Sequence, residues 1–196
     1  MRNLFSAYGV PAGLLAIILA TGSLGMPAWG EAPTAAADAQ PAVWTHKEKR
    51  YTYMGFTSHY SCDGLRDKIR TTLLKFGARK DLEVTSTGCA GGSGRPVPFP
   101  GVSIKMQVLT PASSTDPQPL QAHWKLVDLT ASRDPLDVAG DCELIEQIKE
   151  QILPLFTTRN VQYQSTCIPN QLQVGSTQLK AEVLVADEQG KAPGGQ

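Results

Sequence analysis

Residues 62–89 read CDGLRDKIRTTLLKFGARKDLEVTSTGC, and residues 142–167 read CELIEQIKEQILPLFTTRNVQYQSTC. Each stretch begins at a cysteine, continues with apolar residues at helical spacing, passes a polar turn and alternates before a second cysteine. A shift of 80 positions lays Cys62 on Cys142 and Phe76 on Phe156, and the second cysteine then differs by two residues in the turn. We interpret the two stretches as copies of one unit. The alternative is that two unrelated amphipathic helices align on their apolar faces.

The apolar positions predict one amphipathic helix in each unit. In the first unit Leu65, Ile69 and Leu73 recur at i, i+4 and i+8, which places them on one helical face. Gly77 stands where a left-handed C-terminal cap is expected. In the second unit Pro154 cannot donate a helical hydrogen bond, so the helix is expected to end just before it.

Six stretches have the alternation or the β-rich composition of strands: residues 51–60, 82–87, 102–108, 123–130, 161–167 and 179–185. Together with the helices they give the order β-α-β-β twice, in repeats 51–110 and 122–187. We therefore expect an α+β fold of tandem β-α-β-β units. Two helices would pack on an antiparallel or mixed sheet, and two disulfides would complete the fold.

The first 30 residues have the pattern of a secretory signal peptide. Arg2 is the only charge before Glu31, residues 10–20 form a short apolar run, and small residues precede position 31. The run is shorter than the roughly 20 residues that a spanning helix needs. We expect cleavage near Gly30, a periplasmic or secreted product and no stable membrane span afterwards. The alternative is an uncleaved anchor.

Two further segments are poor in large apolar residues. Residues 31–43 are rich in alanine and proline, and residues 188–196 are rich in glycine and polar groups, so we predict a flexible linker and a disordered tail. A single α+β domain is expected over residues 44–187. The chain has 18 Lys+Arg and 18 Asp+Glu. This balance gives no electrostatic reason to bind nucleic acid.

The four cysteines are Cys62, Cys89, Cys142 and Cys167. An even number in an exported chain is typical of disulfide bonds. No Cys-x-x-Cys pair indicates a zinc ribbon or a thioredoxin-type redox site. Spacing alone leaves three pairings open. If the two units are homologous, Cys62 pairs with Cys89 and Cys142 pairs with Cys167.

The histidines are His46, His59 and His123, and no two of them have the spacing of a metal site on one helix. We interpret them as residues near strand ends. No convergent set of nucleophile, base and carboxylate is apparent, so we assign no catalytic residue, no metal and no cofactor. The sequence leans away from an enzyme.

Residues 90–101, AGGSGRPVPFPG, follow a cysteine directly. Prolines at every second position favour extended, polyproline-like geometry, which would display Arg95, Val97 and Phe99. A pre-ordered loop with an arginine and an aromatic residue suits binding, because less entropy is lost on association. These three are our candidate partner-binding residues. The alternative is a connector that is merely rich in glycine and proline.

The motifs SCDGLRDKIR, GARKDL and TGC within residues 61–89 resemble a family of uncharacterised exported bacterial proteins. The resemblance implies a periplasmic setting and supplies no catalytic residue. We expect a non-enzymatic periplasmic binding or envelope-assembly accessory module whose partner is an envelope protein. One alternative is a secreted inhibitor that blocks a hydrolase with the 90–101 loop, and another is an enzyme of unknown type.

Overall fold

The computed structural model describes residues 39–89, 94–116, 118–131, 142–168 and 176–187. The predicted signal peptide (1–30), most of the predicted linker and the predicted tail (188–196) lie outside the described residues. The elements are β1 (Gln40–Thr52), α1 (Cys62–Lys75), β2 (Glu83–Thr87), β3 (Gly101–Pro111), β4 (Leu120–Ala131), α2 (Cys142–Gln151), the 3-10 helix η2 (Leu153–Leu155), β5 (Thr158–Ser165) and β6 (Thr177–Ala186).

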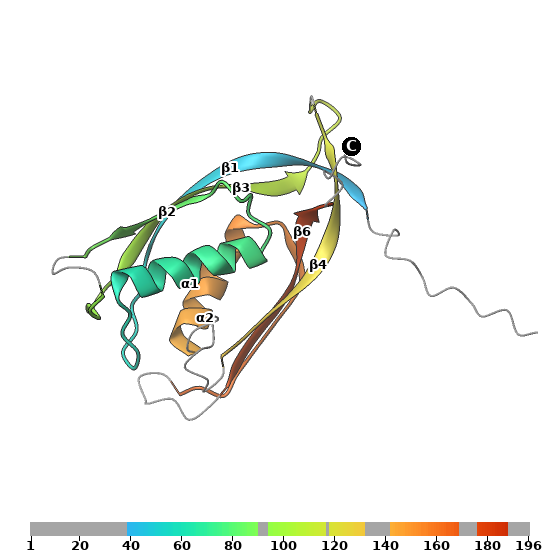
Figure 1. Cartoon of the computed structure of the whole chain (residues 1–196). Coiled ribbons are helices and arrows are strands. Elements are labelled where there is room, and N and C mark those ends of the chain that lie inside the picture. Colours follow the sequence, from blue (N-terminus) through green and yellow to red (C-terminus); the bar gives the residue numbers. More distant parts are fainter. Residues whose placement is uncertain (1–38, 90–93, 117, 132–141, 169–175, 188–196) are drawn as a thin grey trace, which may run out of the picture. The chain divides into compact units, whose positions relative to one another are not determined.

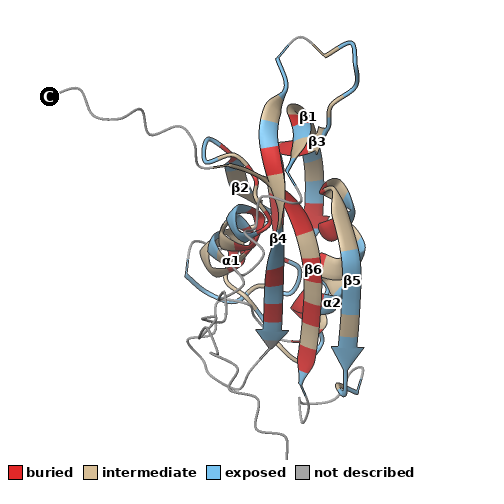
Figure 2. Cartoon of the chain, turned by 90° about the vertical axis from the view of Figure 1, so that its right-hand side faces the viewer, coloured by how far each residue is buried: buried red, intermediate tan, exposed pale blue. Residues whose placement is uncertain are grey.

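The strands form one sheet of six, in the order β2-β3-β1-β4-β6-β5, and every neighbouring pair is antiparallel. Figure 1 shows this sheet curving around α1 and α2, which lie on the same face. The expected α+β class with two helices on an antiparallel sheet is confirmed. Burial alternates along β4 and β6 in Figure 2, as it must in strands with one face on the core.

The ends of α1 are fixed as the sequence suggests. The Ser61 hydroxyl accepts a hydrogen bond from the Gly64 N–H at 3.1 Å, which caps the first turn. After the last turn, Gly77 adopts a φ of 87°, in the left-handed region. A Cβ on Gly77 would lie 2.6 Å from Cγ1 of Val185 on β6. Glycine is therefore required here both by the backbone conformation and by the close approach of β6.

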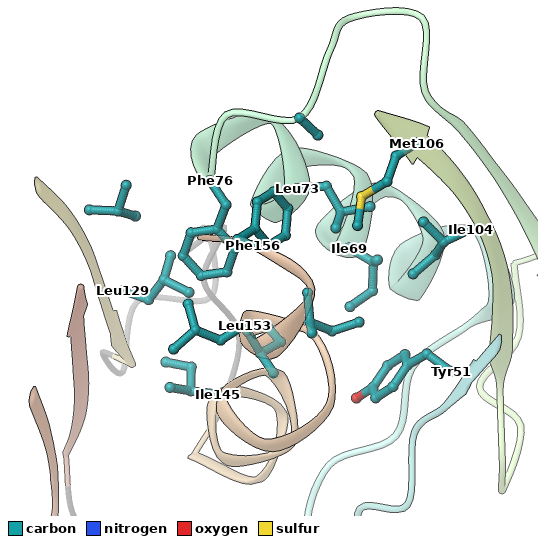
Figure 3. Close-up of a cluster of buried hydrophobic side chains, with 14 of the residues drawn as sticks. Tyr51, Ile69, Leu73, Phe76, Ile104, Met106, Leu129, Ile145, Leu153 and Phe156 are labelled. Atoms are coloured by element: carbon teal, nitrogen blue, oxygen red, sulfur yellow. The ribbon is translucent and has the colours of Figure 1, made fainter. Parts of the chain in front are cut away.

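The main core lies between the helices and the inner face of the sheet (Figure 3). Leu65, Ile69 and Leu73 of α1 are fully buried, as their spacing predicts. The rings of Phe76 and Phe156, which follow the two helices, meet edge to face with centroids 5.3 Å apart. This aromatic contact joins the first half of the chain to the second.

A second, smaller cluster lies on the outer face of the sheet, away from the helices. Four side chains are buried there and four are partly buried: Ala42, Leu109, Ala122 and Leu184, then Trp44, Leu120, Trp124 and Ala186. The Arg79 guanidinium lies 5.9 Å from the Trp44 ring centroid, and the Arg159 guanidinium lies 4.5 Å from that of Trp124. Both tryptophans are thus partly covered by cation–π contacts.

The predicted disulfide pairing is confirmed. Cys62 is bonded to Cys89 and Cys142 to Cys167, with Cα–Cα distances of 6.1 and 6.4 Å. Each bridge ties the first residue of a helix to the segment that follows the next strand. Disulfides of this kind are typical of proteins that fold outside the cytoplasm.

Strand β1 differs from the sequence prediction at both ends. It begins at Gln40, so residues 40–43 of the predicted linker lie in a strand, and His46 lies within that strand. It also ends at Thr52, so the prediction of a strand over residues 51–60 was wrong beyond that position. Residues 53–60 form a loop instead.

Candidate functional site

The predicted binding loop is described from Gly94 onward, while residues 90–93 lie outside the described residues. Arg95 is exposed, Val97 is half-buried, and Phe99 keeps 62% of its surface exposed. The structure therefore places Arg95 and Phe99 in solvent, as predicted, and turns Val97 partly inward. The predicted extended, polyproline-like geometry is wrong at Pro98 and Phe99, where the backbone bends.

Backbone hydrogen bonds join this loop to residues 53–61. The Val97 N–H donates to the Tyr60 carbonyl at 3.2 Å, and the Tyr53 N–H donates to the Pro100 carbonyl at 2.9 Å. Next to the first of these bonds, Ser61 and Pro96 form an isolated β-bridge. The Cys62–Cys89 disulfide closes the base of both loops. The two loops thus support each other beside the N-terminal end of α1 (Figure 1).

Residues 53–57 add two apolar side chains that the sequence analysis missed. Met54 is 61% exposed and Phe56 is 73% exposed, whereas Tyr53 beside them is 1% exposed. The Tyr53 ring packs edge-on against Tyr60, with centroids 5.0 Å apart. Gly55 lets the chain pass over this ring, because a Cβ there would overlap it. The glycine inside an aromatic run was the signal that the strand stops.

Side chains of α2 hold the same residues from the other half of the chain. The Glu143 carboxylate accepts hydrogen bonds from the N–H groups of Phe56 (2.9 Å) and Thr57 (3.1 Å). The Gln147 amide accepts from the Met54 N–H and donates to the Met54 carbonyl, both at 3.1 Å. The loop backbone is therefore fixed although it has no regular secondary structure.

We use the name loop surface for Met54, Phe56, Arg95, Val97 and Phe99. It offers apolar side chains and one arginine on a fixed backbone. Large apolar side chains left in water on ordered loops are a common mark of an interaction site. In chemical terms the loop surface can bind a partner, and it contains no acid–base or nucleophilic pair.

The histidines lie in different surroundings. Nδ1 of His123 pairs with the Asp187 carboxylate, and Nε2 of His46 lies 3.1 Å from Oε1 of Glu48. His59 is exposed in the loop after β1. Among the described residues, no group of three or more His, Cys, Asp or Glu is arranged to hold a metal ion.

Comparison with known proteins finds no matching family model, no matching curated protein and no matching solved structure. Within the described ranges, neither helix is long and apolar enough to cross a membrane.

Proposed function

We propose that the chain is a non-enzymatic periplasmic binding or envelope-assembly accessory module that captures an envelope protein through the loop surface. The observation that carries the proposal is the exposure of Phe56 (73%) and Phe99 (62%) on loops whose backbones are fixed. Aromatic side chains contribute strongly to protein interfaces. A fixed loop loses little entropy on binding, so more of the contact energy appears as affinity.

The periplasmic part of the proposal rests on two features. The first is the signal-peptide pattern of residues 1–30. The second is the pair of disulfides, which form and persist in oxidising compartments. In this proposal the signal is cleaved near Gly30, and the folded part works in the periplasm or outside the cell.

We further propose that the fold arose by duplication of one β-α-β-β unit. The sheet order supports this, because exchanging β1, β2 and β3 for β4, β5 and β6 gives the same order read from the other edge. Registers agree as well: Trp44 lies opposite Leu109, and Trp124 lies opposite Leu184. The cation–π pairs Trp44–Arg79 and Trp124–Arg159 also differ by 80 positions in both members.

An inhibitor of a hydrolase is the second candidate function. It is favoured by residues 95–100, which backbone hydrogen bonds hold near both ends and which lie close to a disulfide. A loop of this kind can enter an active site without losing its shape. The identity of the captured partner decides between the two candidates.

The test is site-specific photo-crosslinking in the native envelope, with the reactive group at Phe99. Leu126 on the outer face of β4 is a matched control, because it is an equally exposed apolar residue at 62%. We expect one discrete product at Phe99 and none at Leu126. With the reactive group kept at position 99, we also expect the product to fall when Phe56, the other exposed aromatic residue of the loop surface, is replaced by serine.

Mass spectrometry then identifies the product. A structural or assembly protein of the envelope supports the accessory module, and a hydrolase supports the inhibitor. Equal products at Phe99 and Leu126, or none at either position, would count against the loop surface.

A further inference from the structure

The contacts between α2 and residues 53–57 come from two side chains on one face of the helix. Glu143 and Gln147 are four positions apart, so they project side by side. Both are half-buried, and both reach across to a loop about 90 positions earlier in the chain.

Glu143 gathers three donors at one carboxylate oxygen. Besides the N–H groups of Phe56 and Thr57, the Tyr53 hydroxyl donates to the same Oε2 atom at 3.3 Å. Hydrogen bonds to a charged acceptor are stronger than those between neutral groups. They also satisfy two consecutive backbone N–H groups in a loop with no strand partner of its own.

Gln147 makes hydrogen bonds to the Met54 backbone like those that a neighbouring strand would make. Its amide oxygen accepts from the Met54 N–H and its amide nitrogen donates to the Met54 carbonyl. The Tyr51 hydroxyl also donates to the Gln147 oxygen, at 3.4 Å. One side chain thus makes both hydrogen bonds that a β-ladder would provide, immediately after β1 has ended.

We infer that Glu143 and Gln147 are positioning residues for binding, and that they hold residues 53–57 so that Met54 and Phe56 stay directed into solvent. The inference rests on the proposed function. It adds that α2, in the second half of the chain, holds the conformation of part of the loop surface, which lies in the first half. Without these contacts, Met54, Phe56 and Thr57 lose the side-chain partners of their backbone groups, and the loop must be ordered anew each time a partner binds.

The principal variant is Glu143→Gln in the full mature chain. It keeps the side-chain size but replaces the charged acceptor of the three hydrogen bonds with a neutral amide oxygen. Glu146→Gln is the matched control, because Glu146 is exposed on the same helix and its change is chemically identical. Gln147→Leu is the second variant, and it keeps the test decisive if Glu143→Gln does not fold.

Three readouts separate positioning from stability: amide hydrogen exchange at Met54, Phe56 and Thr57, the global unfolding midpoint, and crosslinking yield at Phe56 and Phe99. In Glu143→Gln we expect exchange at Phe56 and Thr57 to rise about tenfold or more, as expected for losing a charged acceptor. Crosslinking at Phe56 should fall more than crosslinking at Phe99. Glu146→Gln should match the wild type in all three readouts. In Glu143→Gln the global unfolding midpoint should change little, although amide exchange at Phe56 and Thr57 is faster.

Unchanged exchange at Phe56 and Thr57 would overturn the inference. Faster exchange with undiminished crosslinking would show that Glu143 fixes the loop without affecting binding, and would overturn its positioning role. If the wild type captures no partner while Glu143→Gln still exchanges faster, the proposed function fails and the contact between α2 and the loop is upheld.

Discussion

Removal of the Cys62–Cys89 disulfide by alanine substitution at both positions is expected to lower the free energy of unfolding by about 3.6 kcal/mol. The two cysteines are 27 positions apart. For a closed loop of about that many residues, the chain-entropy expression gives roughly 12 cal/mol/K, or about 3.6 kcal/mol at 25 °C. The effect acts on the unfolded chain, which gains freedom when the loop is opened.

Alanine is the appropriate replacement because Cys62 is only 3% exposed. Serine would bury a hydroxyl group there and add a penalty unrelated to the crosslink. The Cys142–Cys167 bridge, with a separation of 25, provides an internal comparison, since the same expression gives about 3.5 kcal/mol. The two double variants should therefore be destabilised equally.

The assay is equilibrium unfolding in guanidinium chloride, followed by the fluorescence of Trp44 and Trp124. The midpoint should fall in both double variants, and the slope of free energy against denaturant should rise, because an uncrosslinked chain exposes more surface on unfolding. A loss below about 1 kcal/mol in both variants would refute the reasoning from chain entropy.

Three further predictions concern single residues. The Arg79 guanidinium holds the pKa of the Asp81 carboxyl below its usual value. The contribution of Asp81 to stability is therefore present above the unfolded pKa and is lost as pH falls through the folded pKa. In an NMR titration, Arg79→Gln should raise the pKa of Asp81. Burial raises the pKa of the Tyr163 phenol above its usual value, so its contribution to stability is present below the unfolded pKa and is lost as pH rises through the folded pKa. A difference titration at 295 nm against Tyr163→Phe should show ionisation at a higher pH than that of a free tyrosine. Gly77→Ala should lower the free energy of unfolding, measured by thermal unfolding, by about 1 to 3 kcal/mol, through its positive φ and its clash with Val185 of β6. Gly94→Ala is the control for the backbone part of that loss, because Gly94 has a φ of 94° and a Cβ added there would meet no atom within 4 Å.

The helix α1, its cap at Gly77 and the alternating strands β3 and β6 could be predicted from the sequence. Their signals are local: Leu65, Ile69 and Leu73 recur at the helical period, and the strand residues alternate at period two. The disulfide pairing followed from the match between the two cysteine-bounded stretches, a pattern that spacing alone does not supply.

The start of β1 could not be predicted, because its residues resemble a linker. Ala42 is fully buried between β3 and β4, at a position where a small side chain fits, and Pro41 lies opposite Gln121. Composition indicates low burial for alanine and proline. The strands that pair with these residues, β3 and β4, lie about 70 to 80 positions later in the chain.

The apolar part of the loop surface was only half predicted. The exposure of Phe99 could be predicted because glycines and prolines keep residues 90–101 out of the helices and the sheet, although the backbone bends at Pro98 and Phe99 instead of running extended. Met54 and Phe56 were taken for strand residues, since aromatic composition favours a strand. Gly55 is a local signal that the strand stops, but the contacts that hold the loop come from Glu143 and Gln147 on α2, and no local pattern near residue 54 indicates them.

The short pairing of β1 with β4 has a mechanical consequence. Among the residues that the structure describes, the strand pairing between the two three-stranded halves of the sheet is confined to Gln40–Ala42 and Leu120–Ala122, whereas β1 and β3 are paired from Ala42 to Thr52. Gln40–Ala42 are also the first paired residues that follow position 39. A pull applied to the chain ahead of residue 39 would load this seam before any other paired strand in the described ranges. Under tension the sheet should part first between β1 and β4, while the disulfide-bridged helices stay attached to their own strands.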